Sequence, residues 1–399
     1  MPKTVQTPEE VEIRTLREKL AGDLRAVFET AGCERVEPSV LQPADIFLDR
    51  SGEDIRRRLY MFTDPGGTEL CLRPDLTIPT CRLFLERAGD EAEARLSYAG
   101  PVYRFQPQGS AKPNEVLQAG AELLGAADCE AADAEAFALA VNGCRAAGLA
   151  DFEIEMGDLS LFDALVDALD IAPGWRSRLK RQFWRPDYFK ELVQRLASGN
   201  SDATNEREGL LAALNALDET SAKSVIEDVL KLASISPVGG RSTGEIAERL
   251  LEQAADASAA PLSPEIVKLI DDFLGLTLSP KEAAPRIREL TAKAGISIEP
   301  RLAALEKRLA AIEAKGFNLS KARFQTGFGR RLEYYTGFVF ELQVPELGPE
   351  KVIAGGGRYD GLLKSLGASQ AVPAVGCAFT VERLARALKA SSRKGGVAK

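Results

Sequence analysis

The chain has 399 residues, of which 45% are hydrophobic and 28% charged, so it can form two or three domains and has the composition of a soluble globular protein. Its 51 Lys and Arg residues against 59 Asp and Glu residues leave a net charge of −8, which disfavours nucleic acid as the main partner. Histidine is absent, which excludes Ser-His-Asp triads, Cys-His pairs and the usual zinc sites.

The first ten residues are polar and acidic, and no run approaches the roughly 18 apolar residues that a membrane span needs. The six cysteines contain no Cys-x-x-Cys pair. We therefore expect a cytoplasmic protein with buried, reduced thiols, no metal site and no membrane contact.

The first segments along the chain combine one helix with several strands. Residues 9–30 have a helical spacing of apolar side chains, and the alternating, proline-containing segment 35–43 predicts an edge or interface strand. Residues 60–72 predict a hairpin with its turn at 64–67. The next predicted elements are a helix over 76–88, strands over 96–105 and 116–125, a helix over 133–147, a strand over 152–156 and a helix over 159–169.

From residue 175 to about 312, nearly every segment has a helical pattern. Strand patterns return at 322–326, 334–342, 352–354 and 375–379, and a helix from Val381 follows. This order predicts an α+β domain formed by residues 1–170 and 318–390, a helical insertion over 171–317 and a flexible tail over 391–399.

Three polar segments could contribute to a ligand site. Asp75 and Thr77 lie between a strand and a helix, where they could bind an ammonium group, although a helix cap explains the pair better in isolation. Arg104, at a strand end, could bind a phosphate or carboxylate, or could simply be solvated. Gln118 and Glu122 alternate onto one strand face and could hold a cationic amino acid.

Two later segments carry the strongest pattern. Residues 330–341 join a charged cluster and the pair Tyr334-Tyr335 to an alternating strand, and residues 354–362 place three glycines before a helix. Glycines allow close approach of the backbone to a ligand, which indicates a ligand site on a sheet. Paired tyrosines are, however, ordinary core residues, and a Gly triplet is common in turns.

Taken in order, these segments resemble the signature sequences of class II histidyl-tRNA synthetases. The resemblance implies a class II synthetase-like antiparallel sheet flanked by helices. It implies that the acid and hydroxyl near position 75 bind the α-amino group of histidine, and that the paired tyrosines wall the imidazole pocket. The implied histidine-binding residues are Asp75, Thr77, Gln118, Glu122, Arg330, Tyr334 and Tyr335.

Departures from the synthetase pattern concern the nucleotide and tRNA. Gln106 replaces the acid that follows the ATP-binding arginine, here Arg104, and Thr380 replaces a glycine before the second ATP-binding arginine, here Arg383. Because few residues follow Arg383, we expect the anticodon-binding domain of the synthetases to be absent. We therefore expect Arg104, Gln106 and Arg383 to form a vestigial nucleotide or phosphate site, with no catalytic residue and no cofactor.

This combination resembles the regulatory-subunit family of ATP phosphoribosyltransferase, which are paralogues of histidyl-tRNA synthetase. The resemblance implies a non-catalytic protein of the first step of histidine biosynthesis. It also implies a hetero-octamer with the short-form catalytic subunit, L-histidine as feedback effector, and no nucleic-acid partner. The segment 35–41 resembles class II motif 1, which implies a homodimeric core.

Three alternatives remain open from the sequence. The first is an active histidine-adenylating enzyme, a truncated histidyl-tRNA synthetase-like ligase, because Arg104, Arg330 and Arg383 are all present. The second is a binding module for a nucleic acid or translation factor. The third is a purely structural activator of the phosphoribosyltransferase that does not bind histidine.

Overall fold

The computed structural model describes residues 8–48, 57–89, 92–110, 112–183, 185–198, 261–329 and 334–396. By its internal contacts the chain divides into two compact units. The sheet unit comprises Met1–Phe162, Phe273–Lys293 and Ser297–Lys399, and the helical unit comprises Asp163–Asp272 and Ala294–Ile296. This division assigns most of residues 273–317 to the sheet unit, although their helical pattern groups them with the predicted insertion.

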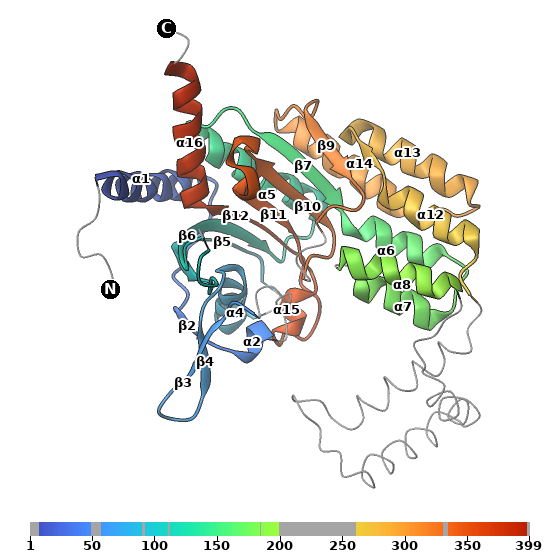
Figure 1. The fold of residues 1–399 in the computed structure, drawn as a ribbon, viewed down its shortest axis with the longest axis horizontal. Coiled ribbons are helices and arrows are strands. Elements are labelled where there is room, and N and C mark those ends of the chain that lie inside the picture. The colour runs from blue at the N-terminus through green and yellow to red at the C-terminus, as the bar shows by residue number, and fades with distance from the viewer. Residues whose placement is uncertain are drawn as a thin grey trace. The chain divides into compact units, whose positions relative to one another are not determined.

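Within the described residues, the sheet unit contains a nine-stranded sheet of order β1-β5-β6-β12-β11-β10-β7-β9-β8 (Figure 1). The strands are β1 (Glu34–Arg35), β5 (Ala94–Tyr103), β6 (Glu115–Leu124), β7 (Glu153–Asp158), β8 (Thr277–Leu278), β9 (Ala322–Gln325), β10 (Phe338–Gln343), β11 (Val352–Arg358) and β12 (Ala374–Thr380).

The sheet is mixed, which corrects the predicted antiparallel sheet. All pairs from β5 through β7 are antiparallel, whereas β1 pairs with β5 and β9 pairs with β7 in parallel. An alternating sequence pattern identifies a strand but contains no information on the direction of its neighbour. The α+β class, with one large sheet and flanking helices, agrees with the prediction.

A second, three-stranded antiparallel sheet has the order β2 (Leu41–Pro43), β4 (Glu69–Leu72), β3 (Tyr60–Thr63). The predicted hairpin turn at 64–67 is confirmed, because Oδ1 of Asp64 accepts hydrogen bonds from the backbone N of Gly66 and Thr68. Gly67 adopts the left-handed conformation, with φ 87°, that the turn requires.

The helices of the sheet unit include α5, which begins at the side-chain cap of Asp128 on the Ala131 N–H. Helix α16 continues through Gly396, into the segment predicted as a tail. In the described residues the helices of this unit are α1 (Pro8–Thr30), α2 (Asp45–Leu48), α4 (Thr77–Ala88), α5 (Cys129–Ala146), α13 (Pro280–Lys293), α14 (Glu299–Ala314), α15 (Leu362–Ser365), α16 (Val381–Gly396) and the 3₁₀ helix η1 (Pro345–Glu350).

Helices α6 (Leu159–Ala168) and α12 (Pro264–Leu274) each begin in one unit and end in the other. The helical unit itself contains α7 (Pro173–Gln182) and α8 (Pro186–Ser198), which contact each other. Their apolar side chains form its described core, with Trp175, Leu179, Phe189 and Leu192 buried.

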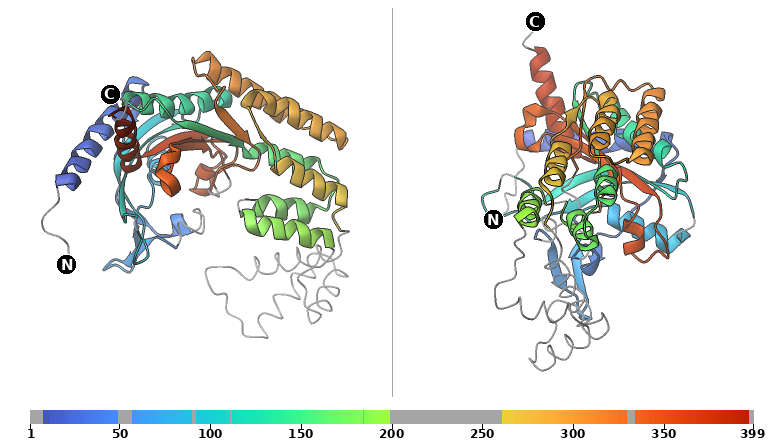
Figure 2. Two further views of the ribbon diagram at one scale, coloured as in Figure 1. Left: turned by 45° about the horizontal axis from the view of Figure 1, so that its top comes forward. Right: turned by 90° about the vertical axis from the view of Figure 1, so that its right-hand side faces the viewer.

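Alternate residues of the large sheet point to opposite faces. Leu123 and Val375 pack with Ala132 and Ala136 of α5 on one face. The adjacent residues on the same strands, Leu124 and Ala374, join a core with α2, α4 and α15 on the other face. Figures 1 and 2 show the corresponding layers, with α5 along one face of the sheet. Since Glu122 and Leu124 share a face, Glu122 points toward the layer that contains α4.

Candidate functional site

The centre of the site is the carboxyl group of Glu122, on β6. The Tyr98 hydroxyl, from β5, donates a hydrogen bond to Oε1 of Glu122 at 2.8 Å. The hydroxyl of Tyr359, just after β11, donates to Oε2. All three side chains are about 1% exposed. Three segments far apart in the sequence therefore hold one buried carboxyl group in a fixed orientation.

Two glycines, one on β6 itself and one on the neighbouring strand β12, make room for this group. A Cβ on Gly376 would lie 1.6 Å from Oε2 of Glu122. A Cβ on Gly120 would lie 2.4 Å from the carbonyl oxygen of Cys377 and 2.6 Å from the Tyr98 hydroxyl. Real side chains cannot approach so closely, so both positions require glycine while the carboxyl group stays where it is.

Asp75 and Gln118 fix the start of helix α4 beside this carboxyl group. Oδ1 of Asp75 accepts from the Ile78 N–H at 3.1 Å, so Asp75 does cap α4. Oε1 of Gln118 accepts from the Leu76 N–H at 2.9 Å, which ties β6 to the first turn. Thr77 Oγ1 lies 3.4 Å from the Tyr98 hydroxyl. The structure thus brings the predicted residues of this pair of segments together.

The second oxygen of Asp75 is the exceptional atom. Asp75 is only 5% exposed, and its buried Oδ2 has no hydrogen-bond partner in the described part of the chain. A buried carboxylate oxygen without a donor is costly, and native proteins seldom contain one without a function or a missing ligand. Oδ2 is therefore available for a donor supplied by a ligand.

Burial dominates the electrostatics of both carboxyl groups. It raises the pKa of Glu122 from its ordinary 4.5 to about 7, although the hydrogen bonds from Tyr359 and Tyr98 act in the opposite direction. Burial also raises the pKa of Asp75, against the opposing effects of the Ile78 N–H and Arg104. Two carboxyl groups that share a poorly solvated site favour a cationic ligand.

Tyrosine rings stand beside the carboxyl groups. The rings of Tyr334 and Tyr335 lie edge to face with centroids 5.0 Å apart, and Tyr334 also lies edge to face with Tyr359 at 5.7 Å. The predicted aromatic residues are thus connected to the tyrosine that holds Glu122. Arg330, the remaining predicted histidine-binding residue, lies outside the described residues.

The predicted phosphate residues line a separate cavity of about 60 Å³. Nε of Arg104 donates to the Pro74 carbonyl at 2.8 Å, and burial lowers the pKa of Arg104. Nη1 of Arg383 donates to the Val352 carbonyl at 3.0 Å. The cavity is lined by Arg58, Arg104, Gln106, Lys112, Pro113, Asn114, Val116, Glu350, Thr380, Glu382, Arg383 and Arg386.

Two carboxylates already engage the cations around this cavity. Glu350 of η1 pairs with Arg386 and lies 3.9 Å from Nε of Arg383. Glu382 pairs with Arg17 at 3.0 Å and accepts from the Leu117 N–H at 2.9 and 3.0 Å. The positive charge that faces the cavity is therefore partly neutralised by the chain itself.

Several residues of the site were not predicted from the sequence. Tyr98 gave no signal beyond its place in a strand, and Tyr359 was visible only as part of the glycine segment. Glu350 precedes a strand and matched no motif. Their roles depend on contacts with residues 24 to 237 positions away in the sequence, so no local pattern could reveal them.

Metal ligands, membrane-spanning helices and cysteines can be examined in the described residues. Among the residues that the structure describes, no group of three His, Cys, Asp or Glu side chains could hold a metal ion. In the same part of the chain, no helix combines the length and the apolarity that crossing a membrane requires. The six cysteines are free thiols; Cys129 is half-buried and the others are buried.

Comparison with known proteins places this geometry in a family. A family model described as Histidyl-tRNA synthetase matches residues 7–248 and 229–384. A Brucella anthropi protein named ATP phosphoribosyltransferase regulatory subunit is 37% identical over 362 residues, which cover 90% of this chain and 95% of that protein. The chain belongs to the ATP phosphoribosyltransferase regulatory subunit family.

Further similarities agree with this family assignment. A regulatory subunit from Chelativorans sp. is 36% identical over 368 residues, covering 92% of this chain and 96% of that protein. A Bacillus halodurans structure described as an ATP phosphoribosyltransferase regulatory subunit/histidyl-tRNA synthetase has a TM-score of 0.66 and 23% identity, and the match covers 97% of this chain and 81% of that one. That likeness supports the synthetase-like fold.

Membership in the regulatory subunit family bears on the alternative of an active enzyme. The relatives bear the name of a regulatory subunit, so the chain has a regulatory and not a catalytic role in histidine biosynthesis. The alternative of an active histidine-adenylating enzyme is not favoured.

Proposed function

We propose that this regulatory chain binds L-histidine between Asp75 and Glu122 and transmits feedback inhibition to a short-form catalytic ATP phosphoribosyltransferase subunit. The observation that carries the proposal is the buried, unpartnered Oδ2 of Asp75 close to a second buried carboxyl group. Histidine supplies an ammonium group for the first and an imidazole for the second. Charge-assisted hydrogen bonds of this kind are the strong ones in proteins.

In the proposed complex each group of the site has one role. Asp75 and Thr77 accept from the α-ammonium group. Glu122, held by two tyrosine hydroxyls, contacts the imidazole, and Tyr334 and Tyr335 wall its ring. Gln118 holds the start of α4 beside β6 through its hydrogen bond with the Leu76 N–H. Arg330 contributes to binding of the same ligand.

The cavity lined by Arg104 and Arg383 supports a regulator that does not adenylate histidine. Gln106 cannot act as an acid. Glu350 forms an ion pair with Arg386 and lies close to Arg383, so these two cations are partly neutralised. Arg104, Gln106 and Arg383 then form a vestigial phosphate site, and the chain needs no cofactor. We expect the protein to act in the cytoplasm as part of a hetero-octamer, without nucleic acid.

We also propose a homodimeric core that covers the outer face of the three-stranded sheet. Leu41 and Phe62 on this face are 47% and 42% exposed, and large exposed apolar faces generally mark an interface. The strand register places six apolar residues there: Leu41, Pro43, Tyr60, Phe62, Leu70 and Leu72. Phe62→Glu should dissociate the dimer in sedimentation velocity. Met61→Glu, a similarly exposed residue on the other face, should leave it intact.

The histidine proposal is tested by calorimetric titration and by reconstitution with a catalytic subunit. L-Histidine should bind the purified chain, and Glu122→Ala should abolish both binding and feedback inhibition of the complex while leaving its uninhibited activity unchanged. The surface variant Glu69→Ala serves as control. Unchanged feedback inhibition in Glu122→Ala would place the effector site elsewhere. Histidine-dependent ATP–pyrophosphate exchange above background would restore the adenylating alternative.

A further inference from the structure

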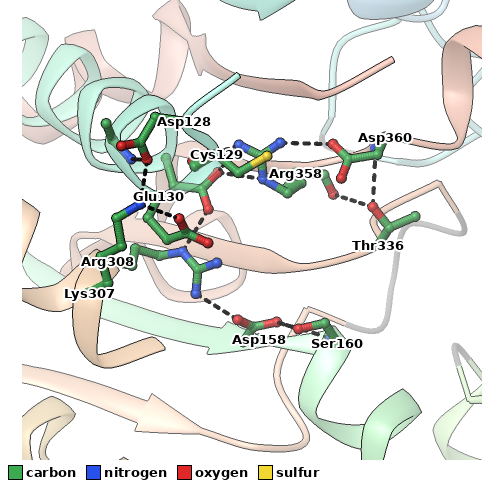
Figure 3. A network of polar contacts seen from close by, with 12 residues as sticks. Asp128, Cys129, Glu130, Asp158, Ser160, Lys307, Arg308, Thr336, Arg358 and Asp360 are labelled. Atoms are coloured by element: carbon green, nitrogen blue, oxygen red, sulfur yellow. Dashed lines mark hydrogen bonds and ion pairs between the residues drawn. The ribbon is translucent and has the colours of Figure 1, made fainter. Parts of the chain in front are cut away.

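A buried ion network joins Arg308 of helix α14 to Arg358 (Figure 3), the residue directly before Tyr359. Arg308 of α14 donates to Oδ2 of Asp133, on α5, at 2.6 Å and to Oδ2 of Asp158, at the end of β7, at 2.7 Å. Arg358, the last residue of β11, donates to Oδ1 of Asp133 at 2.8 Å. These four side chains are at most 5% exposed.

Asp133 is the shared acceptor, with one oxygen for each arginine, so it fixes the two guanidinium groups relative to each other. Burial lowers the pKa of Arg308, but the ion pairs with Asp158 and Asp133 raise it more, so the net shift of the Arg308 pKa is upward. Burial raises the pKa of Asp133, against the opposing effects of Arg308 and Arg358. Removing one member leaves an uncompensated buried charge, so the remaining groups must rearrange.

The network continues through the backbone to the tyrosines of the site. The Thr336 N–H donates to the Arg358 carbonyl at 2.8 Å, and the Asp360 N–H donates to Oγ1 of Thr336 at 3.1 Å. Thr336 directly follows Tyr335, and Tyr359 directly follows Arg358. The backbone of Arg358 is therefore linked directly to the segments that carry the aromatic wall and the hydroxyl that donates to Glu122.

We propose that Arg308 is a positioning residue for the amino-acid site, acting through Asp133 and Arg358. This proposal rests on the histidine site proposed above. It assigns a role to helix α14, which the sequence pattern grouped with an insertion of unknown purpose. Side chains that hold a binding residue through buried hydrogen bonds decide whether it keeps its productive geometry.

The test uses Arg308→Met together with a charge-balanced double variant, Arg308→Met with Asp158→Asn. The double variant removes one cation and one carboxylate, so Asp133 and Arg358 still form a neutral pair if the single variant fails to fold. Lys307→Met is the matched control. Lys307 is the neighbouring residue on α14, and on the surface it pairs at 2.9 Å with Asp128, the N-cap of α5, and with Glu130 of α5.

The first readout is the fluorine NMR spectrum of full-length protein labelled with 3-fluorotyrosine, in which the seven tyrosines are assigned by single Tyr→Phe changes. The resonances of Tyr335 and Tyr359 should shift in the double variant and stay in place in Lys307→Met. The resonances of Tyr60 and Tyr188 should not move in either. Unshifted Tyr335 and Tyr359 resonances in the folded double variant would overturn the proposal.

The second readout is the dissociation constant for L-histidine, which should rise at least tenfold in the double variant and less than twofold in Lys307→Met. Equal affinity of the wild type and the double variant would also refute the positioning role, while the histidine site would stand. If the wild type binds no histidine but the tyrosine resonances shift as expected, the proposed effector is wrong and the positioning of the segment is supported.

Discussion

The Tyr98 hydroxyl donates to Oε1 of Glu122 at 2.8 Å, while among the described residues no Lys or Arg forms an ion pair with this carboxyl group. Two phenols are weak compensation for a buried negative charge, which is why burial raises the pKa of Glu122 to about 7. Near pH 7 the Glu122 carboxyl group is therefore protonated about half of the time, and a cationic ligand can supply the positive charge that the chain withholds.

The first prediction concerns stability without ligand. Because the pKa of Glu122 is about 7 in the folded chain and 4.5 in the unfolded chain, the folded state binds more protons between these values. Stability should then fall as the pH rises from about 4.5 to 7, by about 3 kcal/mol in total. Glu122→Gln should remove this loss, which urea unfolding at pH 5 and pH 8 will measure. An identical pH dependence in both proteins would contradict it.

The second prediction concerns the pH dependence of histidine binding. The ordinary imidazole pKa is about 6.5, close to that of Glu122, so the pair must share one proton in the complex. The affinity should be greatest near neutral pH. On either side it should decrease, with a limiting slope of about tenfold per pH unit. Calorimetry between pH 5 and 8.5 can measure this profile. In Glu122→Gln the affinity should no longer decrease at alkaline pH, because the amide oxygen can accept a hydrogen bond from the N–H of neutral imidazole. A flat profile in the wild type would count against the contact.

The third prediction separates the two ends of the ligand. Asp75→Asn should weaken L-histidine binding more than tenfold, because the ammonium group loses its charged acceptor. Binding of imidazolepropionate, which lacks the amino group, should change less than twofold. Calorimetry with both ligands decides the question. Equal losses for the two ligands would mean that Asp75 acts only as the cap of α4.

The fourth prediction concerns the space around Glu122. A Cβ on Gly376 would lie 1.6 Å from Oε2 of Glu122, so Gly376→Ala should cost more than about 2 kcal/mol in urea unfolding and abolish histidine binding. Gly22→Ala is the control, since nothing lies within 4 Å of a Cβ there and alanine favours helix α1. A stable, histidine-binding Gly376→Ala protein would show that the carboxyl group can move aside.

The sequence was most informative where the chemistry is local. The turn at Asp64, the cap at Asp75 and the alternation of Gln118 with Glu122 each follow from neighbours in the chain. The parallel edge strands could not be predicted, because strand direction depends on the path of the chain between strands. The Arg308–Asp133 contact was equally hidden, since it joins residues 175 positions apart on helices that look ordinary.

The last prediction concerns the cation-lined cavity. Glu350 pairs with Arg386 and lies near Arg383, so its charge opposes the binding of an anion beside Arg104. Glu350→Gln should therefore raise the affinity for inorganic pyrophosphate about tenfold at low salt, with a smaller gain at high salt because salt screens the attraction. Calorimetric titration with pyrophosphate measures the change.

The matched control is Glu346→Gln, on the same 3₁₀ helix but absent from the lining of the cavity. This variant should bind pyrophosphate as the wild type does. In both variants ATP–pyrophosphate exchange should stay at background, because Gln106 and Thr380 still depart from the catalytic pattern. Unchanged pyrophosphate affinity in Glu350→Gln would show that shape, and not the neutralising carboxylate, keeps anions out of the cavity.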